Sequence, residues 1–294
     1  MPRTYPIVLV PGIGRFDVVW SELLGIDNNS RYDGWHYFRN IRTHLIENGF
    51  DVYHAKLGWA DGHDVRAPEL AEEVERACER FNTERVHIVA HSMGGLDARK
   101  MLYNFRDLGI PARVASLTTI GTPHHGSAFA DWTVKWLGRG LRMIAGALGT
   151  SVEGLWDLTE DSAAALNAEI SEWEETGSDV YYQAFAGKQR FLFIFGLLKI
   201  PWIIIRRNGG ENDGLSSVVS ARWNDKHFVG PLLDLDHLNQ IGWWEPTEIL
   251  RGHTPRSLNR EVQGFYLKIC EELADRFRLM HPSASSQSSN QTGH

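Results

Sequence analysis

The sequence has little of what several protein classes require. Only two of its 294 residues are cysteine, which excludes a disulfide scaffold. No stretch reaches the roughly 18 to 20 uninterrupted apolar residues of a membrane-spanning helix, because the nearest candidate, 191–205, is broken by Lys199 and Pro201. Acidic residues outnumber basic ones, 37 to 30, so the chain as a whole lacks the positive charge that nucleic-acid binding needs. We expect neither a nucleic-acid partner nor a transmembrane segment.

The first residues also lack the pattern of a secretory signal. Residues 5–10 form a short apolar run that leads directly into Pro11 and Gly12, with no basic region before it and no small-residue cleavage site after it. This run is typical of a strand. We therefore expect a cytoplasmic protein, or a secreted one in its mature form.

What is present is an alternation of short apolar runs with segments of helical periodicity. The predicted strands are residues 5–10, 51–56, 85–90, 113–120, 179–186 and 226–233, and the predicted helices include 34–48, 66–81, 96–108 and 257–279. Such alternation predicts an α/β fold in which a mostly parallel central sheet is covered by helices on both faces.

No internal repeat or linker divides the chain. We expect a single domain over residues 1–282 with an insertion at about 127–176, which concentrates tryptophan. The Ser/Gln/Asn-rich tail, 283–294, is expected to be disordered.

The most informative segment is 85–95, where an apolar run stops at a small-x-Ser-x-Gly turn. A serine in such a turn adopts a strained backbone conformation at the end of a strand, which requires small residues two positions before and after it. Ala90 and Gly94 meet this requirement around Ser92. A lone Ser-x-Gly also fits an ordinary loop, but the strand before it and the helix after it favour a nucleophile in front of a helix N-terminus.

Several blocks of the chain together resemble the bacterial true lipases of family I, within the α/β-hydrolase superfamily. The blocks occur in the family's order at residues 5–13, 90–97, 120–127, 157–159, 166–167 and 212–215. The resemblance implies an α/β-hydrolase fold with a helical lid or cap in the insertion, and hydrolysis of carboxylic esters.

A serine hydroxyl needs a general base, and the base needs a group that fixes its tautomer. In this fold the chain order is serine, acid, histidine. The acid in the matching context after Ser92 is Asp213, with Glu211 and Asp234 as alternatives, and the base is His237. These three side chains are the predicted catalytic triad.

Three other histidines compete with His237 for the role of base. His91 lies beside the serine in sequence, where its side chain should point away from the site toward packing. His124 and His125 belong to the family's Gly-x-Pro-His-x-Gly-Ser loop, which we expect to shape the site rather than to transfer protons.

The oxyanion hole needs two backbone N–H donors. One is expected to be that of Met93, which follows the nucleophile. By the family's pattern the other follows a His-Gly pair after the first strand. Here Pro11 replaces that histidine, so the donor becomes Ile13.

The resemblance bears on metal binding as well. Family I lipases commonly hold calcium near the catalytic histidine through an aspartate two residues after it and a downstream glutamine. Asn239 stands at the aspartate position and 237–240 is shortened, so we expect no metal and no other cofactor. Cys78 and Cys270 should lie on opposite faces of the sheet as free thiols.

The insertion contains an amphipathic helix. Lys135, Arg139 and Arg142 fall in one narrow arc, and tryptophans and aliphatic residues fill the opposite half. Such a helix can shelter an apolar cleft and then lie on a lipid surface, although a core-facing helix has the same pattern. Its position favours a mobile cover. Residues 191–205 are either a second apolar flap or a buried core segment.

These observations predict a serine ester hydrolase, a lipase or carboxylesterase, that cleaves esters with lipophilic acyl chains through an acyl-enzyme. A polyester depolymerase or an acyltransferase would use the same machinery, and a non-catalytic relative that binds a hydrophobic ligand is the alternative from another class. The expected partners are a lipid or small-molecule ester and, transiently, a lipid interface.

Overall fold

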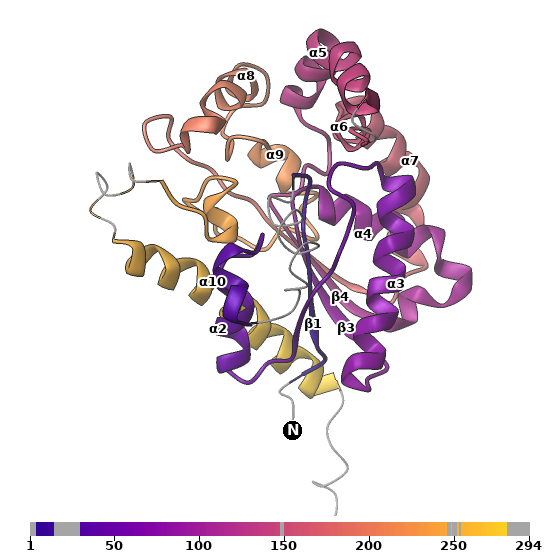
Figure 1. Ribbon diagram of the computed structural model, residues 1–294. Coiled ribbons are helices and arrows are strands. Elements are labelled where there is room, and N and C mark those ends of the chain that lie inside the picture. The colour runs from indigo at the N-terminus through magenta and orange to yellow at the C-terminus, as the bar shows by residue number, and fades with distance from the viewer. Residues whose placement is uncertain are drawn as a thin grey trace, which may run out of the picture.

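A parallel sheet lies at the centre of the computed structural model, which describes residues 4–14, 30–147, 150–245, 248, 252 and 254–280 (Figure 1). Within these residues the sheet has five strands in the order β2-β1-β3-β4-β5, and every neighbouring pair is parallel. The strands are β1 (Ile7–Val10), β2 (Val52–His54), β3 (Val86–His91), β4 (Val114–Ile120) and β5 (Tyr181–Phe185).

Helices connect the strands and make up the insertion. The α-helices are α2 (Ile41–Glu47), α3 (His63–Phe81), α4 (Met93–Asn104), α5 (Ala128–Ala147), α6 (Gly154–Asp157), α7 (Glu160–Thr176), α8 (Lys199–Gly209), α9 (Val218–Ala221) and α10 (Pro255–Met280). Short 3-10 helices are η1 (Ser30–Trp35), η2 (Arg106–Leu108), η3 (Ile110–Arg113), η4 (Gly196–Leu198) and η5 (Asn239–Ile241).

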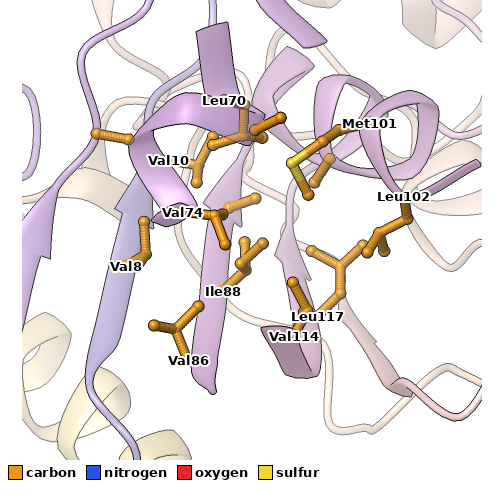
Figure 2. Packing of buried hydrophobic residues seen from close by; sticks show 14 of the residues in the cluster. Val8, Val10, Leu70, Val74, Val86, Ile88, Met101, Leu102, Val114 and Leu117 are labelled. Atoms are coloured by element: carbon orange, nitrogen blue, oxygen red, sulfur yellow. The ribbon is translucent and has the colours of Figure 1, made fainter. Parts of the chain in front are cut away.

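Alternate residues of each strand point to opposite faces of the sheet, so each face has its own apolar layer. On one face Val8 and Ile88 pack with Leu70 of α3 and Met101 of α4 (Figure 2). On the other face the strands pack with α2 and α10. The predicted α/β architecture, covered on both sides, is confirmed.

The sheet also separates the two cysteines. Cys78 belongs to the apolar layer under α3, Cys270 belongs to the layer under α10, and both thiols are buried and free. The predicted placement of the two cysteines on opposite faces of the sheet is confirmed.

Two predicted elements differ from the structure. Residues 226–233 do not form a strand, because only isolated parallel bridges join Phe228 and Leu233 to the chain around β5, and Pro231 within this run has no N–H to donate. The helix predicted over 34–48 is interrupted by Asn40, whose left-handed backbone (φ 57°) separates η1 from α2.

The insertion forms α5, α6 and α7. Helix α8 lies at the same end of the molecule and contacts α5 (Figure 1). The apolar half of α5 is exposed, with Trp136 65% and Met143 77% accessible, so the alternative of a core-facing helix is wrong. A mobile cover stays a prediction. Residues 191–205 fit neither alternative completely, since Ile194, Leu198 and Ile205 are buried whereas Leu197 and Ile200 are exposed.

None of the helices in the described ranges combines the length and the apolar character that crossing a membrane requires. The disorder predicted for 283–294 falls outside the described residues, and the domain limits stay a prediction.

Candidate active site

Ser92 occupies a sharp turn between β3 and α4. Its φ of 57° and ψ of −134° are strained for a residue with a side chain. A Cβ at Gly94 would lie 2.6 Å from the carbonyl oxygen of Pro11, so this position requires glycine. The methyl group of Ala90 is buried without displacing the turn. The predicted elbow geometry is present, and the family's usual glycine at position 90 is not needed.

The loop after β1 lies directly against this serine. A Cβ at Gly12 would stand 2.6 Å from Cβ of Ser92 and 2.8 Å from the hydroxyl of Tyr37. The Ser92 carbonyl is fixed from the other side by the hydroxyl of Thr122, at 2.8 Å. Gly12 and the turn therefore form one tightly packed unit.

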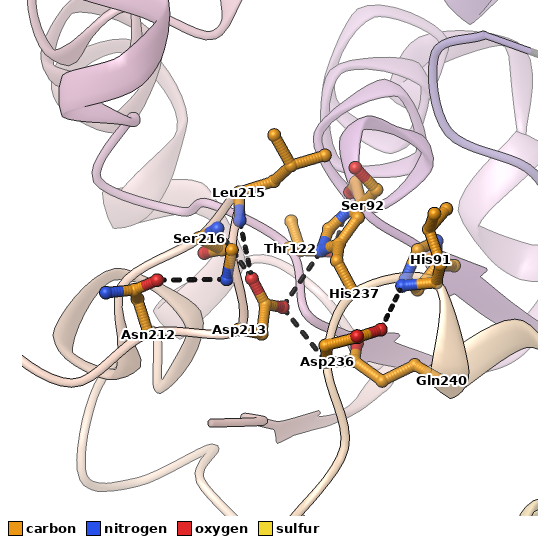
Figure 3. Close-up of polar contacts among 12 residues, drawn as sticks. His91, Ser92, Thr122, Asn212, Asp213, Leu215, Ser216, Asp236, His237 and Gln240 are labelled. Atoms are coloured by element: carbon orange, nitrogen blue, oxygen red, sulfur yellow. Dashed lines mark hydrogen bonds and ion pairs between the residues drawn. The ribbon is translucent and has the colours of Figure 1, made fainter. Parts of the chain in front are cut away.

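The structure brings His237 and Asp213 together. Nδ1 of His237 is 2.8 Å from Oδ2 of Asp213, and both side chains are buried. The His237 N–H also donates to the Asp213 carbonyl oxygen at 2.8 Å, which fixes the two loops to each other. The imidazole lies between the Asp213 carboxylate and Ser92 (Figure 3).

The Asp213 carboxylate is held on both oxygens. Oδ1 accepts from the N–H groups of Leu215 and Ser216 at 3.0 and 2.7 Å, and Oδ2 accepts from Nε2 of Gln240 at 2.9 Å (Figure 3). One oxygen thus closes the Asn-Asp-Gly turn and the other faces His237. A turn-forming role and a contact with the His237 imidazole therefore coexist in one residue.

The two alternative acids lie elsewhere. Glu211 is exposed and pairs with Lys188 at 3.0 Å, and Asp234 is exposed as well. Among the described residues, Asp213 is the carboxylate that contacts the His237 imidazole.

Ser92 Oγ makes no hydrogen bond within the described part of the chain. Catalytic hydrogen bonds are often long in a ligand-free enzyme and tighten in the complex. The neighbouring His91 ring lies 4.4 Å from that of His237, centroid to centroid, so the turn that carries Ser92 packs directly against His237.

Two backbone N–H groups next to Ser92 have no acceptor among the described residues: those of Ile13 and Met93. The carbonyl of Gly12 accepts from Nη2 of Arg66 at 3.3 Å. Because a trans peptide directs its carbonyl and its N–H to opposite sides, this bond aims the Ile13 N–H away from Arg66.

A buried network that the sequence reasoning missed supports this loop. Arg66 also donates to the Pro11 carbonyl and, through Nε, to Asp97 of α4, at 2.8 Å each. Burial alone would raise the pKa of Asp97, but Arg66 and His63 outweigh it and the pKa is lowered. The ionised pair therefore joins the loop after β1 to the helix that follows Ser92.

The competing histidines have other partners. Nδ1 of His91 shares a hydrogen bond of 2.8 Å with the hydroxyl of Tyr37. Burial, and after it the nearby His237, hold the pKa of His91 well below its usual range. Its ring is packed, as predicted, but it packs against the His237 ring rather than away from the site. His124 is stacked on Trp223 and is likewise kept neutral by burial. His125 contacts the Trp223 carbonyl at 2.7 Å.

Asp236, next to the base, ties two loops together. Its carboxylate accepts from the N–H groups of Phe195, Leu238 and Asn239 at 2.7, 3.0 and 2.8 Å, and burial raises its pKa to about 7. Asn239 Oδ1 in turn accepts from the Asp236 N–H. Backbone donors face every one of these oxygens, and no group of three metal-ligating residues occurs in the described ranges. The absence of a metal stays a prediction.

Comparison with known proteins agrees with this geometry. The family described as alpha/beta hydrolase fold matches residues 5–156. A triacylglycerol lipase of Pseudarthrobacter phenanthrenivorans is 32% identical over 86% of this chain and 96% of its own length. A triacylglycerol lipase of Burkholderia plantarii is also 32% identical, over 86% of this chain and 85% of its own.

Solved structures share the fold. Lipase 1 from Pelosinus fermentans superposes with a TM-score of 0.63 at 19% identity, covering 92% of this chain and 98% of its own. The mature lipase of Bacillus licheniformis gives 0.59 at 23%, covering 81% and 86%. The predicted superfamily, fold class and enzyme class are confirmed. The chain belongs to the alpha/beta hydrolase fold family and is a carboxylic ester hydrolase of the lipase type.

Proposed function

We propose that this enzyme hydrolyses carboxylic esters with lipophilic acyl chains by means of Ser92, His237 and Asp213. The observation that carries the proposal is the buried contact of 2.8 Å between His237 Nδ1 and Asp213 Oδ2, beside a serine held in a strained turn. A binding protein has no physical need for this combination.

In the first step His237 Nε2 takes the hydroxyl proton of Ser92 as Oγ attacks the ester carbonyl. Asp213 accepts the Nδ1–H bond and stabilises the imidazolium that forms. The N–H groups of Ile13 and Met93 bind the oxyanion, since both lack another acceptor in the described chain. The tetrahedral intermediate then collapses, and the imidazolium gives its proton to the leaving alkoxide.

In the second step water replaces the alcohol. His237 takes a proton from this water, whose oxygen attacks the acyl carbonyl, and the acid leaves as the proton returns to Ser92 Oγ. No metal or cofactor takes part in the proposed reaction.

The lipophilic substrate is supported by two observations. Exposed apolar side chains are concentrated on α5 and on residues 191–203, and the second of these segments contacts the loop of His237 through the Phe195 N–H, which donates to Asp236. The relatives named above are triacylglycerol lipases by name. A short-chain esterase, a polyester depolymerase and an acyltransferase would share the same catalytic groups.

A fluorophosphonate probe tests the nucleophile. We expect the native chain to label and Ser92→Ala not to label, with Ser151→Ala as a matched control that labels normally. If the native chain fails to react, or if Ser92→Ala reacts equally, the enzyme is not a Ser92 hydrolase. A series of p-nitrophenyl esters then tests which acyl chain length the enzyme prefers. Activity confined to the shortest esters would exclude a lipase and leave a short-chain esterase.

A further inference from the structure

A buried cluster of polar side chains connects the Asp213 carboxylate with the loop beside Ser92, and it takes no part in the proton transfers described above. The cluster contains Gln240, His91 and Tyr37, which come from η5, from β3 and from the segment between η1 and α2. All three side chains are buried. They are far apart in the sequence, so the fold brings them together behind the proposed triad.

The orientation of the Gln240 amide is fixed by the acceptors around it. Its Nε2 lies 2.9 Å from Oδ2 of Asp213 and 3.5 Å from the carbonyl oxygen of Leu235. An ionised carboxylate and a carbonyl group only accept hydrogen bonds, so the NH2 group of the amide must face them. Oε1 of Gln240 then lies on the other side. Oε1 and Nε2 of His91 are both buried, neither has another partner in the described part of the chain, and the two side chains interact (Figure 3).

The Gln240 amide therefore determines which nitrogen of His91 carries the hydrogen. An amide oxygen can only accept, so Nε2 of His91 must donate to it, and a neutral imidazole has a single N–H. Nδ1 is then left with a lone pair, and it lies 2.8 Å from Oη of Tyr37. The tyrosine hydroxyl must donate to Nδ1.

This arrangement requires His91 to be neutral, and its surroundings keep it so. The side chain is fully buried, and its ring lies 4.4 Å from that of His237, centroid to centroid. Burial, and after it the charge of His237, lower the pKa of His91. A second positive charge here would oppose the imidazolium that the proposed mechanism forms on His237.

The other end of the cluster lies beside the serine. The position that a Cβ of Gly12 would take is 2.8 Å from Oη of Tyr37 and 3.1 Å from Oγ of Ser92. The backbone of Tyr37 is held as well, because its carbonyl oxygen accepts from Nε1 of Trp243 at 3.0 Å. The cluster therefore runs from a hydroxyl next to Ser92 to the carboxylate of the proposed acid.

We infer that Tyr37, His91 and Gln240 are positioning residues that act as one unit, which we call the Tyr37–Gln240 relay. The Tyr37 hydroxyl donates to His91, and the His91 Nε2–H donates to Gln240. The Gln240 amide donates to Asp213. Hydrogen bonds that follow one another in this way polarise each other, so all three favour the negative charge on Asp213. The inference rests on the proposed function, because that charge acts by stabilising the His237 imidazolium.

The tautomer of His91 tests the relay without catalysis. In a Ser92→Ala chain with ¹⁵N-labelled histidine, we expect the NMR signals of His91 to show a hydrogen on Nε2 and an unprotonated Nδ1. The signals are assigned by their loss when His91→Phe is added. A hydrogen on Nδ1, or a charged ring at neutral pH, would overturn the inference, whatever the fluorophosphonate probe shows for Ser92.

A double-mutant cycle tests whether the relay acts on the reaction. Tyr37→Phe removes one hydrogen bond between neutral groups, so kcat for a water-soluble ester should fall by about threefold to tenfold with little change in KM. In the Gln240→Leu background His91 has lost its acceptor, and Tyr37→Phe should then change kcat by less than about twofold, as residues of one network do. Equal factors in both backgrounds, or no effect in either, would contradict the relay.

Tyr182→Phe is the matched control for Tyr37→Phe. It removes a buried tyrosine hydroxyl that lies 2.8 Å from Oγ of Ser178, on the face of the sheet opposite to Tyr37. We expect it to leave kcat unchanged, and a loss equal to that of Tyr37→Phe would show a general effect of losing a buried hydroxyl, so the relay would be wrong. Thermal unfolding shows which variants are folded. Should Tyr37→Phe fail to fold, the tautomer of His91 decides the question by itself.

Discussion

Gln240 donates a hydrogen bond of 2.9 Å to Oδ2 of Asp213, the same carboxylate oxygen that faces the His237 imidazole. The Gln240 side chain also interacts with His91, whose ring packs on that of His237. One amide therefore touches the acid and the ring behind the base. In the proposed mechanism it would fix the position of the Asp213 carboxylate while the His237 imidazole is charged.

Replacing Gln240 by leucine should slow catalysis. A hydrogen bond to a charged group contributes about 1.5–3 kcal/mol, so kcat for a soluble ester should fall by roughly tenfold or more with little change in KM. Gln263→Leu on α10 is the matched control. Unchanged kcat in Gln240→Leu would show that the two backbone N–H groups on Oδ1 suffice to orient Asp213.

Arg66→Met should lower both stability and activity. Breaking a buried ion pair by removing one partner costs about 3–5 kcal/mol, because the other charge stays buried, and the loop that carries the Ile13 N–H loses its support. Adding Asp97→Leu removes the buried carboxylate that lost its partner. The midpoint temperature of thermal unfolding should therefore return much of the way to that of the native chain. We expect kcat in the double variant to remain reduced by about 10²-fold; a stable, fully active double variant would contradict the role of this pair.

Gly12→Ala should inactivate the enzyme while it remains folded. Its Cβ would overlap that of Ser92 at 2.6 Å, and displacing a reacting group by about 1 Å can cost 10²-fold in rate. Gly264→Ala is the control, because nothing lies within 4 Å of the added carbon on α10, and alanine there should stabilise the helix by up to about 1 kcal/mol. Full activity in Gly12→Ala would show that the contact is relieved without cost.

The contribution of Asp236 to stability should depend on pH. Its folded pKa of about 7 lies above the ordinary value of 3.8, so the folded state binds the proton more tightly than the unfolded state. The contribution is complete below about pH 4 and is lost as the pH rises through 7. Relative to Asp236→Asn, the native chain should therefore lose free energy of unfolding between these limits, on the order of 1 kcal/mol for each pKa unit. The free energy of unfolding of both chains is measured by denaturant titration at several pH values. If it changes with pH in the same way in the native chain and in Asp236→Asn, the pKa of Asp236 is not raised.

The central sheet and the proposed triad could be predicted because their signals are local. β3 is a continuous apolar run that ends at a turn whose small residues the chemistry demands, and chain order then points to Asp213 and His237. The run over 226–233 is also rich in apolar residues, but it contains Gly230 and Pro231, and a proline cannot donate to a ladder. The proline was a signal in the sequence against a strand, and the apolar pattern outweighed it in the prediction.

The Arg66–Asp97 pair could not be predicted in the same way. Its members lie 31 positions apart on two helices, and nothing near either residue specifies the other. One weak signal existed, since Arg66 falls one turn before Leu70 on the apolar stripe of α3. A cation on such a stripe indicates a buried partner, but the tertiary structure decides which one.

The backbone of Ser92 has a thermodynamic consequence. Its positive φ is costly for any residue with a Cβ, by about 1–3 kcal/mol, but not for glycine. Alanine at this position would keep that cost and glycine would remove it. The proposed nucleophile thus stands at a site where the residue best for folding and the residue best for reaction are different, and we expect the native chain to be less stable than its Ser92→Gly variant.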